Sequence, residues 1–189
     1  MFDATRIQAL LAELDGELQQ RGVRGELFVV GGAAMALAYN TRRSTRDIDA
    51  VFEPKQAVYD AAAAVAANHH DVPADWLNDA VKGLMLGADP ASTVVYSTVG
   101  LNVRVASPGY LFAMKVVAAR VERDADDLAE LYRLMGFTSA HEAFQFLEST
   151  FPEAGLLPRT QYLIEDIAGA VATESDSRPA PDQVETERE

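Results

Sequence analysis

The 189-residue sequence contains no cysteine, which excludes disulfide bridges and thiolate chemistry. It also lacks a run of about 18 apolar residues, the length that a membrane-spanning helix requires. The first residues do not follow the pattern of a secretory signal, because charged side chains such as Asp3, Arg6 and Glu13 interrupt them. We therefore expect a cytoplasmic protein with no membrane partner.

Basic residues are scarce. The chain has 16 Lys and Arg against 29 Asp and Glu, so its formal net charge is −13. Residues 173–189 account for −4 of this charge, which leaves −9 on the rest of the chain. A protein that neutralises nucleic-acid phosphates normally carries a basic surface, so this composition argues against broad nucleic-acid binding. A local basic rim that includes Arg42, Arg43 and Arg46 stays open, as does the pairing of most arginines with surface acids.

One segment combines the features of a phosphate-binding turn. An apolar run at 27–30 breaks at Gly31 and Gly32, and residues with high helix propensity follow at 33–38. This order predicts a strand, a tight turn and a helix. Glycines let a ligand approach the backbone closely, and a helix start presents unpaired N–H groups to an anion. We therefore expect Gly31 and Gly32 to bind a phosphate.

A second strand is predicted at residues 47–52, where polar and apolar side chains alternate. Asp47 and Asp49 then share one face of the strand, about 6–7 Å apart at ~3.3 Å per residue, while Ile48 faces the core. Two carboxylates this close repel each other unless a cation lies between them. Mg²⁺ commonly takes one or two carboxylates and completes its shell with water and phosphate oxygens, so the pair predicts a magnesium site.

The ordered set of Gly-Gly, a helix, Arg-Ser-Thr-Arg at 43–46 and Asp-x-Asp at 47–49 resembles the signature of the DNA polymerase β-type nucleotidyltransferase superfamily. More narrowly, the chain is similar to the bacterial toxin branch, which includes the abortive-infection AbiEii and mycobacterial MenT nucleotidyltransferases. Supporting similarity lies at 75–79, in Ser107-Pro108 followed by Lys115, and in Arg123-Asp124 followed by Asp127. The resemblance spans about residues 27–134.

This resemblance implies an enzyme that transfers a nucleoside monophosphate from an NTP to an acceptor hydroxyl, with Mg²⁺ held by Asp47 and Asp49. It implies a catalytic role for Asp127, nucleotide binding by Arg46, and both roles for Lys115. The acceptor that it implies is the 3′ end of tRNA. The protein would then be the toxin of a toxin–antitoxin system, with a cognate antitoxin as its partner.

Structural roles stay open for the two downstream residues. Lys115 lies among apolar residues and could extend its ammonium group to solvent, and Asp127 could be a helix-start acid favoured by the dipole. On one straight helix the two residues would lie about 120° apart in azimuth and roughly 18 Å apart along the axis. A break is therefore predicted near residues 120–123, with Asp124 capping a second helix and Asp127 as its third residue.

One departure from the superfamily pattern concerns a later strand. Many polymerase β-type enzymes carry a third carboxylate there, whereas the predicted strand at 101–106 offers Asn102 and Arg104. We expect Asp47 and Asp49 to hold the metal together with substrate oxygens. Two alternatives stay open: nucleotidyl transfer to a protein or small molecule, which suits an acidic surface, and an NTP-binding module that has lost turnover.

The expected fold is α/β (α+β), with a small mixed sheet of the nucleotidyltransferase type, flanking helices and a C-terminal helical part. Residues 1–106 are expected to form the nucleotidyltransferase core, 107–172 a helical part that completes the active site, and 173–189 a disordered acidic tail.

Trp76 either packs in the core or shapes the nucleotide pocket with Asn78. Apolar side chains at helical spacing predict two buried stripes, Leu111, Met114, Val117 and Ala118, and Leu128, Leu131 and Leu134.

Overall fold

The computed structural model describes residues 1–39, 43–118, 121–152 and 157–176. In this part of the chain one sheet is formed by β1 (Gly25–Val29), β2 (Ile48–Glu53), β3 (Leu77–Asn78), β4 (Thr93–Ser97) and β5 (Leu101–Val105), in the order β3-β2-β1-β5-β4. Strand β1 runs parallel to β5 and antiparallel to β2, β2 is parallel to β3, and β4 is antiparallel to β5. The expected α/β class with a mixed sheet is confirmed.

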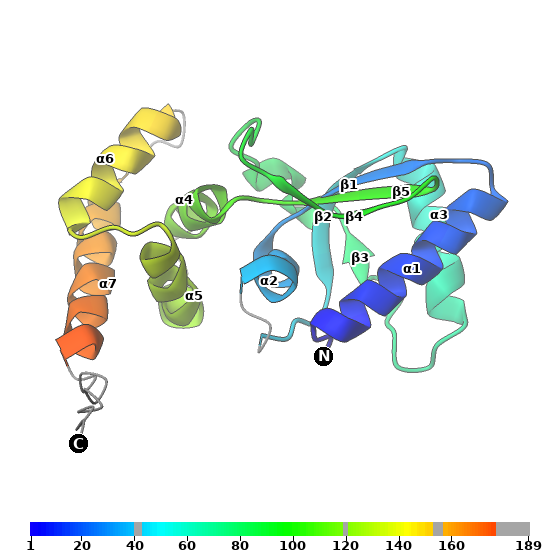
Figure 1. Cartoon of the computed structure of the whole chain (residues 1–189), viewed down its shortest axis with the longest axis horizontal. Coiled ribbons are helices and arrows are strands. Elements are labelled where there is room, and N and C mark those ends of the chain that lie inside the picture. The colour runs from blue at the N-terminus through cyan, green and yellow to red at the C-terminus, as the bar shows by residue number, and fades with distance from the viewer. Residues whose placement is uncertain (40–42, 119–120, 153–156, 177–189) are drawn as a thin grey trace, which may run out of the picture.

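Helices lie against one side of this sheet and beyond one end of it (Figure 1). They are α1 (Ala4–Gln20), α2 (Gly31–Ala34), which continues into a π-helical turn (Met35–Tyr39), α3 (Lys55–Ala67), a 3₁₀-helix (Ala80–Leu84), α4 (Pro108–Ala118), α5 (Val121–Leu134), α6 (Ala140–Thr150) and α7 (Pro158–Asp176). Helices α1 and α3 pack against each other and cover the same face of the sheet, whereas α4 to α7 gather beyond one end of it. None of the helices in the described ranges is both long and apolar enough to cross a bilayer.

Helix α1 shows why the sequence folds in this way. Asp3 caps the helix by accepting a hydrogen bond from the backbone N–H of Arg6 at 2.8 Å. The apolar side chains at helical spacing then form one face, and all of them are buried: Ile7, Leu10, Leu11, Leu14 and Leu18. Burial of each such side chain contributes about 1.5–3 kcal/mol. These contacts fix α1 against the sheet and against α3.

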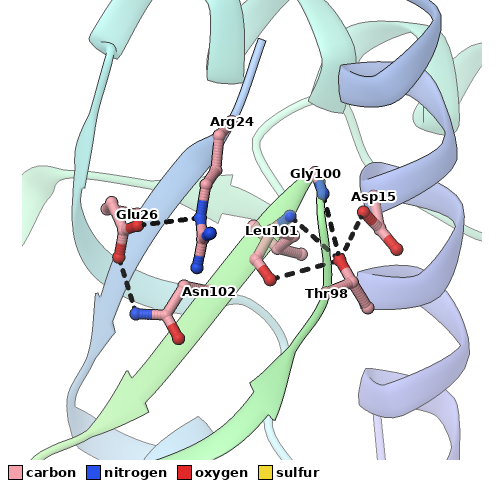
Figure 2. Close-up of polar contacts among 7 residues, drawn as sticks. All are labelled: Asp15, Arg24, Glu26, Thr98, Gly100, Leu101 and Asn102. Carbon is pink, nitrogen blue, oxygen red and sulfur yellow. Dashed lines mark hydrogen bonds and ion pairs between the residues drawn. The ribbon is translucent and has the colours of Figure 1, made fainter.

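A buried carboxylate on α1 fastens the turn between β4 and β5 (Figure 2). Asp15 accepts hydrogen bonds from Gln19 Nε2 at 2.9 Å, Tyr96 Oη at 3.1 Å and Thr98 Oγ1 at 2.8 Å. The Thr98 hydroxyl also accepts from the backbone N–H of Gly100 and of Leu101. Burial alone would raise the pKa of Asp15, but the three side-chain hydrogen bonds and one from Gly100 outweigh it, so the pKa lies below its ordinary value.

Trp76 belongs to the core. Its side chain is fully buried, and its indole N–H donates to the carbonyl of Ala62 at 3.0 Å. Asn78 accepts from the backbone N–H of Ala80 at 3.0 Å, so its side chain holds the entry to the 3₁₀-helix. Of the two interpretations of Trp76, core packing is therefore the one that the structure supports.

The helical part departs from the sequence prediction at three points. On α4 only Leu111 of the predicted stripe is fully buried, because the helix turns Tyr110, Phe112 and Val116 into the core instead. On α5, Leu128 and Leu131 are buried, but Leu134 is 46% exposed because the helix ends there.

The third departure concerns the tail. Helix α7 extends to Asp176, so residues 173–176, expected to be disordered, are helical. The Thr173 hydroxyl donates to the Gly169 carbonyl at 2.9 Å, and Glu174 forms an ion pair with Arg133 of α5. These contacts hold the last turn in place. The rest of the expected tail, residues 177–189, lies outside the described residues.

Candidate active site

The site is built where the turn after β1 meets strand β2. The backbone N–H of Val30 donates to the carbonyl of Asp49 at 2.9 Å, so the glycine pair lies directly beside the strand that carries Asp49. Along β2, Ile48, Ala50 and Phe52 are buried, whereas Asp47, which precedes the strand, and Asp49 are partly exposed. The alternation that was predicted for this strand is confirmed.

The backbone at Gly31 has φ +63°, in the left-handed region that side chains disfavour. A Cβ atom at Gly31 would lie 3.3 Å from Oδ2 of Asp49, and one at Gly32 would lie 3.0 Å from Oγ1 of Thr45. A side chain at either position would therefore crowd a neighbour, the Asp49 carboxylate in the case of Gly31 and the Thr45 hydroxyl in the case of Gly32. This is a more specific reason for glycine than the tight turn inferred from the sequence.

A cavity of about 550 Å³ opens in front of this turn. Its walls include Asp47 and Asp49 together with Gly32, Arg46, Lys115 and Asp127, so most of the residues singled out in the sequence lie around one space. The other charged and polar residues of the lining are Arg43, Ser44, Thr45, Asp75 and Asp124. Gly31 does not line this cavity; it lies on the wall of a smaller one that adjoins it.

Helix α5 closes the cavity with a cluster of ion pairs. Lys115 Nζ lies 2.7 Å from Oδ1 of Asp124 and 2.9 Å from Oδ2 of Asp127. The other oxygen of Asp127 lies 2.5 Å from the guanidinium of Arg43. Lys115 thus points into the site and not to solvent, with 12% of its side chain exposed. The solvent-directed interpretation of Lys115 is wrong.

The break that was predicted before Asp124 exists, but its details differ. Helix α4 ends at Ala118 and α5 begins at Val121, so Asp124 and Asp127 lie in the first two turns of α5 and Asp124 is not its cap. This earlier start turns both carboxylates toward Lys115. Asp127 is only 5% exposed, which a simple helix-start acid on the surface would not be.

Strand β5 contributes nothing to the cavity. The Asn102 amide donates to Glu26 at 2.6 Å, and the Arg104 guanidinium donates to Ser92 Oγ at 3.0 Å and to the Ser92 carbonyl at 2.7 Å. The missing third carboxylate is therefore not replaced from this strand. The other acids of the cavity wall are Asp75 and, on α5, Asp124 and Asp127. Spacing along the sequence does not indicate that these residues lie near Asp47 and Asp49.

The charge of the lining bears on metal binding. Five carboxylates face three cations in the cavity wall, so a triphosphate would meet an excess of negative charge. Asp124 and Asp127 are engaged by Lys115 and Arg43. In the described part of the chain, no group of three or more His, Cys, Asp or Glu side chains is arranged to hold a metal. The carboxylates of Asp47 and Asp49 nevertheless suit Mg²⁺, which binds hard oxygen atoms and takes its other ligands from water and phosphate.

The arginines that could have formed a wider basic rim are mostly paired. Arg21 forms an ion pair with Glu17, and Arg24 lies 3.2 Å from Glu26. Arg46 is exposed and lines the cavity. Arg42 lies outside the described residues. Among the arginines whose side chains the structure describes, those that line the cavity are Arg43 and Arg46.

Comparison with known protein families gives a match over residues 5–135, to a family described as "Nucleotidyltransferase of unknown function (DUF6036)". The match includes every residue of the cavity wall from Gly32 to Asp127. Comparisons with curated proteins and with solved structures gave no match.

Proposed function

The chain belongs to this nucleotidyltransferase family, and from that premise we propose that its cavity transfers a nucleoside monophosphate from an NTP to an acceptor hydroxyl. In this reaction the acceptor hydroxyl loses its proton to water and its oxygen bonds to the α-phosphorus, the bond from that phosphorus to the bridging oxygen of the β-phosphate breaks, and pyrophosphate leaves. The observation that carries the proposal is the convergence of Asp47, Asp49, Gly32 and Lys115 on one cavity. Such a transfer needs positioning and charge neutralisation and requires no covalent intermediate on the enzyme.

Asp47 and Asp49 would hold Mg²⁺ through their carboxylate oxygens. When bound, the ion neutralises phosphate charge and polarises the phosphoryl group. The acidic excess of the cavity supports this part of the proposal, because a triphosphate alone would be repelled by it. Gly32 lets the phosphates approach the backbone at the start of α2.

Lys115 and Arg46 are proposed to act on the leaving group. A lysine ammonium is a compact point charge that can bind pyrophosphate oxygens as negative charge develops on them. Asp124 and Asp127 hold this ammonium at 2.7 and 2.9 Å, so it is positioned before substrate enters. Preorganised charges of this kind cost no reorganisation during the reaction.

The acceptor is proposed to be the 3′ end of tRNA, and the protein to be a toxin that a cognate antitoxin neutralises. This part rests on the resemblance of the Gly-Gly, Asp-x-Asp and Arg-Asp-x-x-Asp motifs to the AbiEii and MenT enzymes. Arg43 and Arg46 at the cavity rim are the residues that would meet an RNA end.

A second acceptor class is favoured by charge. With a net charge of −13 and with Arg21 and Arg24 paired to glutamates, the protein offers little surface to a long RNA. A cationic small molecule, or a protein with a basic surface, would be attracted by the acidic surface and could present the acceptor hydroxyl.

The decisive experiment incubates the purified protein and Mg²⁺ with each α-³²P-labelled NTP, with total tRNA and, separately, with a cell extract. Label on the tRNA 3′ end supports the first acceptor, and label on protein the second. Asp49→Asn should abolish label transfer while the circular dichroism spectrum stays unchanged. Asp166→Asn, the same exchange at an exposed position of α7, should transfer as wild type does. Wild-type transfer by Asp49→Asn would contradict the proposal.

A further inference from the structure

A second, smaller cavity of about 120 Å³ adjoins the first and shares Gly32, Asp49, Lys115 and Asp124 with it. The rest of its lining is different in character, because every other side chain is aliphatic or a thioether. These residues are Val30, Gly31, Val81, Leu84, Leu111, Met114 and Ala118. One end of the space is therefore polar and continuous with the proposed phosphate site, and the rest is apolar.

The outer wall of this second cavity is the 3₁₀-helix, which is fastened at both ends. Before it, Asp79 accepts from Tyr59 Oη at 2.6 Å and pairs with Lys55 Nζ at 2.5 Å; Lys55, followed by Tyr59, lowers the pKa of Asp79. After it, Tyr110 Oη of α4 donates to the Gly87 carbonyl at 3.1 Å and accepts from the Leu86 N–H at 2.8 Å. The wall is thus preformed.

Two observations point to a ligand. Leu84 keeps 49% of its surface exposed at the apolar end of the cavity, and Met114 and Ala118, predicted as core, are partly buried and line the same space. An apolar cavity of roughly 150 Å³ in another protein is known to bind benzene, so the volume here suits a flat six-membered ring.

We propose that the second cavity binds the nucleobase of the donor NTP, whose triphosphate occupies the first cavity; this inference rests on the proposed function. The shared residues Gly32 and Asp49 stand at the junction, where the sugar and α-phosphate would lie. The apolar side chains pack against the ring faces and exclude water from them. Packing, more than hydrogen bonding, then holds the base.

The test compares two ligands in Mg²⁺-containing buffer by isothermal titration calorimetry: an NTP, and inorganic tripolyphosphate, which has the charge but no base. Wild type should bind the NTP more tightly than tripolyphosphate. Leu84→Ser removes apolar surface from the second cavity, and Ala118→Leu fills part of its space. Each variant should bind the NTP on the order of tenfold more weakly than wild type and should bind tripolyphosphate with unchanged affinity. Circular dichroism spectra establish that both variants are folded.

The matched control is Leu134→Ser, the same exchange at a leucine that is 46% exposed and lines neither cavity. It should bind both ligands as wild type does. NTP affinity unchanged in both Leu84→Ser and Ala118→Leu would overturn the inference while leaving the proposed function intact. Failure of wild type to bind either ligand would overturn the proposed function, and this inference with it.

Discussion

Lys115 Nζ lies 2.9 Å from Oδ2 of Asp127, although the two residues belong to different helices, α4 and α5. The second oxygen of Asp127 binds Arg43, which follows the helix of the glycine turn by a few residues. One nearly buried carboxylate therefore joins three segments of the chain around the cavity. Together with Asp124, Asp127 determines where the lysine ammonium lies, and through Arg43 it couples the helical part of the chain to the segment that leads into β2.

Asp127→Asn tests this coupling. The amide keeps the shape of the side chain but removes the charge that Lys115 and Arg43 share. We expect the free energy of unfolding to fall by about 1–3 kcal/mol, since hydrogen bonds to charged groups are lost and Arg43 can still reach solvent. Urea unfolding followed by circular dichroism measures this change, and label transfer should fall by a larger factor than the folded fraction does.

Asp126→Asn is the control for that experiment, because Asp126 is the exposed neighbour on the same helix and lies outside the cavity wall. It should leave both the unfolding free energy and label transfer within error of wild type. Equal effects of the two substitutions would mean that the charge of α5 as a whole, and not the contact with Lys115, is what matters.

The strand, the glycine pair and the acid pair could be predicted because each depends on short-range patterns. Alternation places Ile48 inside and Asp49 at the surface wherever the strand packs, and a Gly-Gly break after an apolar run has few structural outcomes. These local features account for the first wall of the cavity.

The second cavity could not be predicted, because it depends on how α4 and the 3₁₀-helix are placed relative to each other. Met114 and Ala118 fit a buried helical stripe equally well whether they touch protein or line a cavity, and only the placement of α4 across a cavity from the 3₁₀-helix decides between these. Likewise, the start of α5 at Val121 and not at Asp124 changes which way Asp124 faces. Sequence spacing within one element does not contain that information.

Gly31→Ala separates backbone strain from crowding of the site. A left-handed conformation costs a residue with a Cβ about 1–2 kcal/mol, and here the new Cβ would also lie 3.3 Å from Asp49 Oδ2. Gly22 has nearly the same φ, +66°, but a Cβ added there would have nothing within 4 Å of it. We expect both alanine variants to lose about 1–2 kcal/mol in urea unfolding, and only Gly31→Ala to lose label transfer beyond its loss of folded protein.

Asp15→Ala should make stability less dependent on pH. The folded-state pKa of Asp15 lies below its ordinary value of 3.8, so the carboxylate stabilises the fold above that value, and this contribution is lost as the pH falls through the folded-state pKa. At neutral pH the variant should be about 1.5–3 kcal/mol less stable than wild type. The difference should narrow in urea titrations carried stepwise below pH 3.8. A constant difference would show that packing, and not ionisation, is responsible.

The character of the second cavity predicts how the four NTPs compete. The side chains that line only this cavity offer no strong hydrogen-bonding group with which to read a base. Large discrimination arises where a site must hydrogen-bond its ligand, whereas apolar walls reject wrong ligands by about 10–200-fold at most. We therefore expect the dissociation constants of ATP, GTP, CTP and UTP, measured by competition against one labelled NTP, to lie within about 200-fold of one another. Discrimination of about 10⁴-fold would require a polar contact to the base, and the base would then have to lie outside the second cavity.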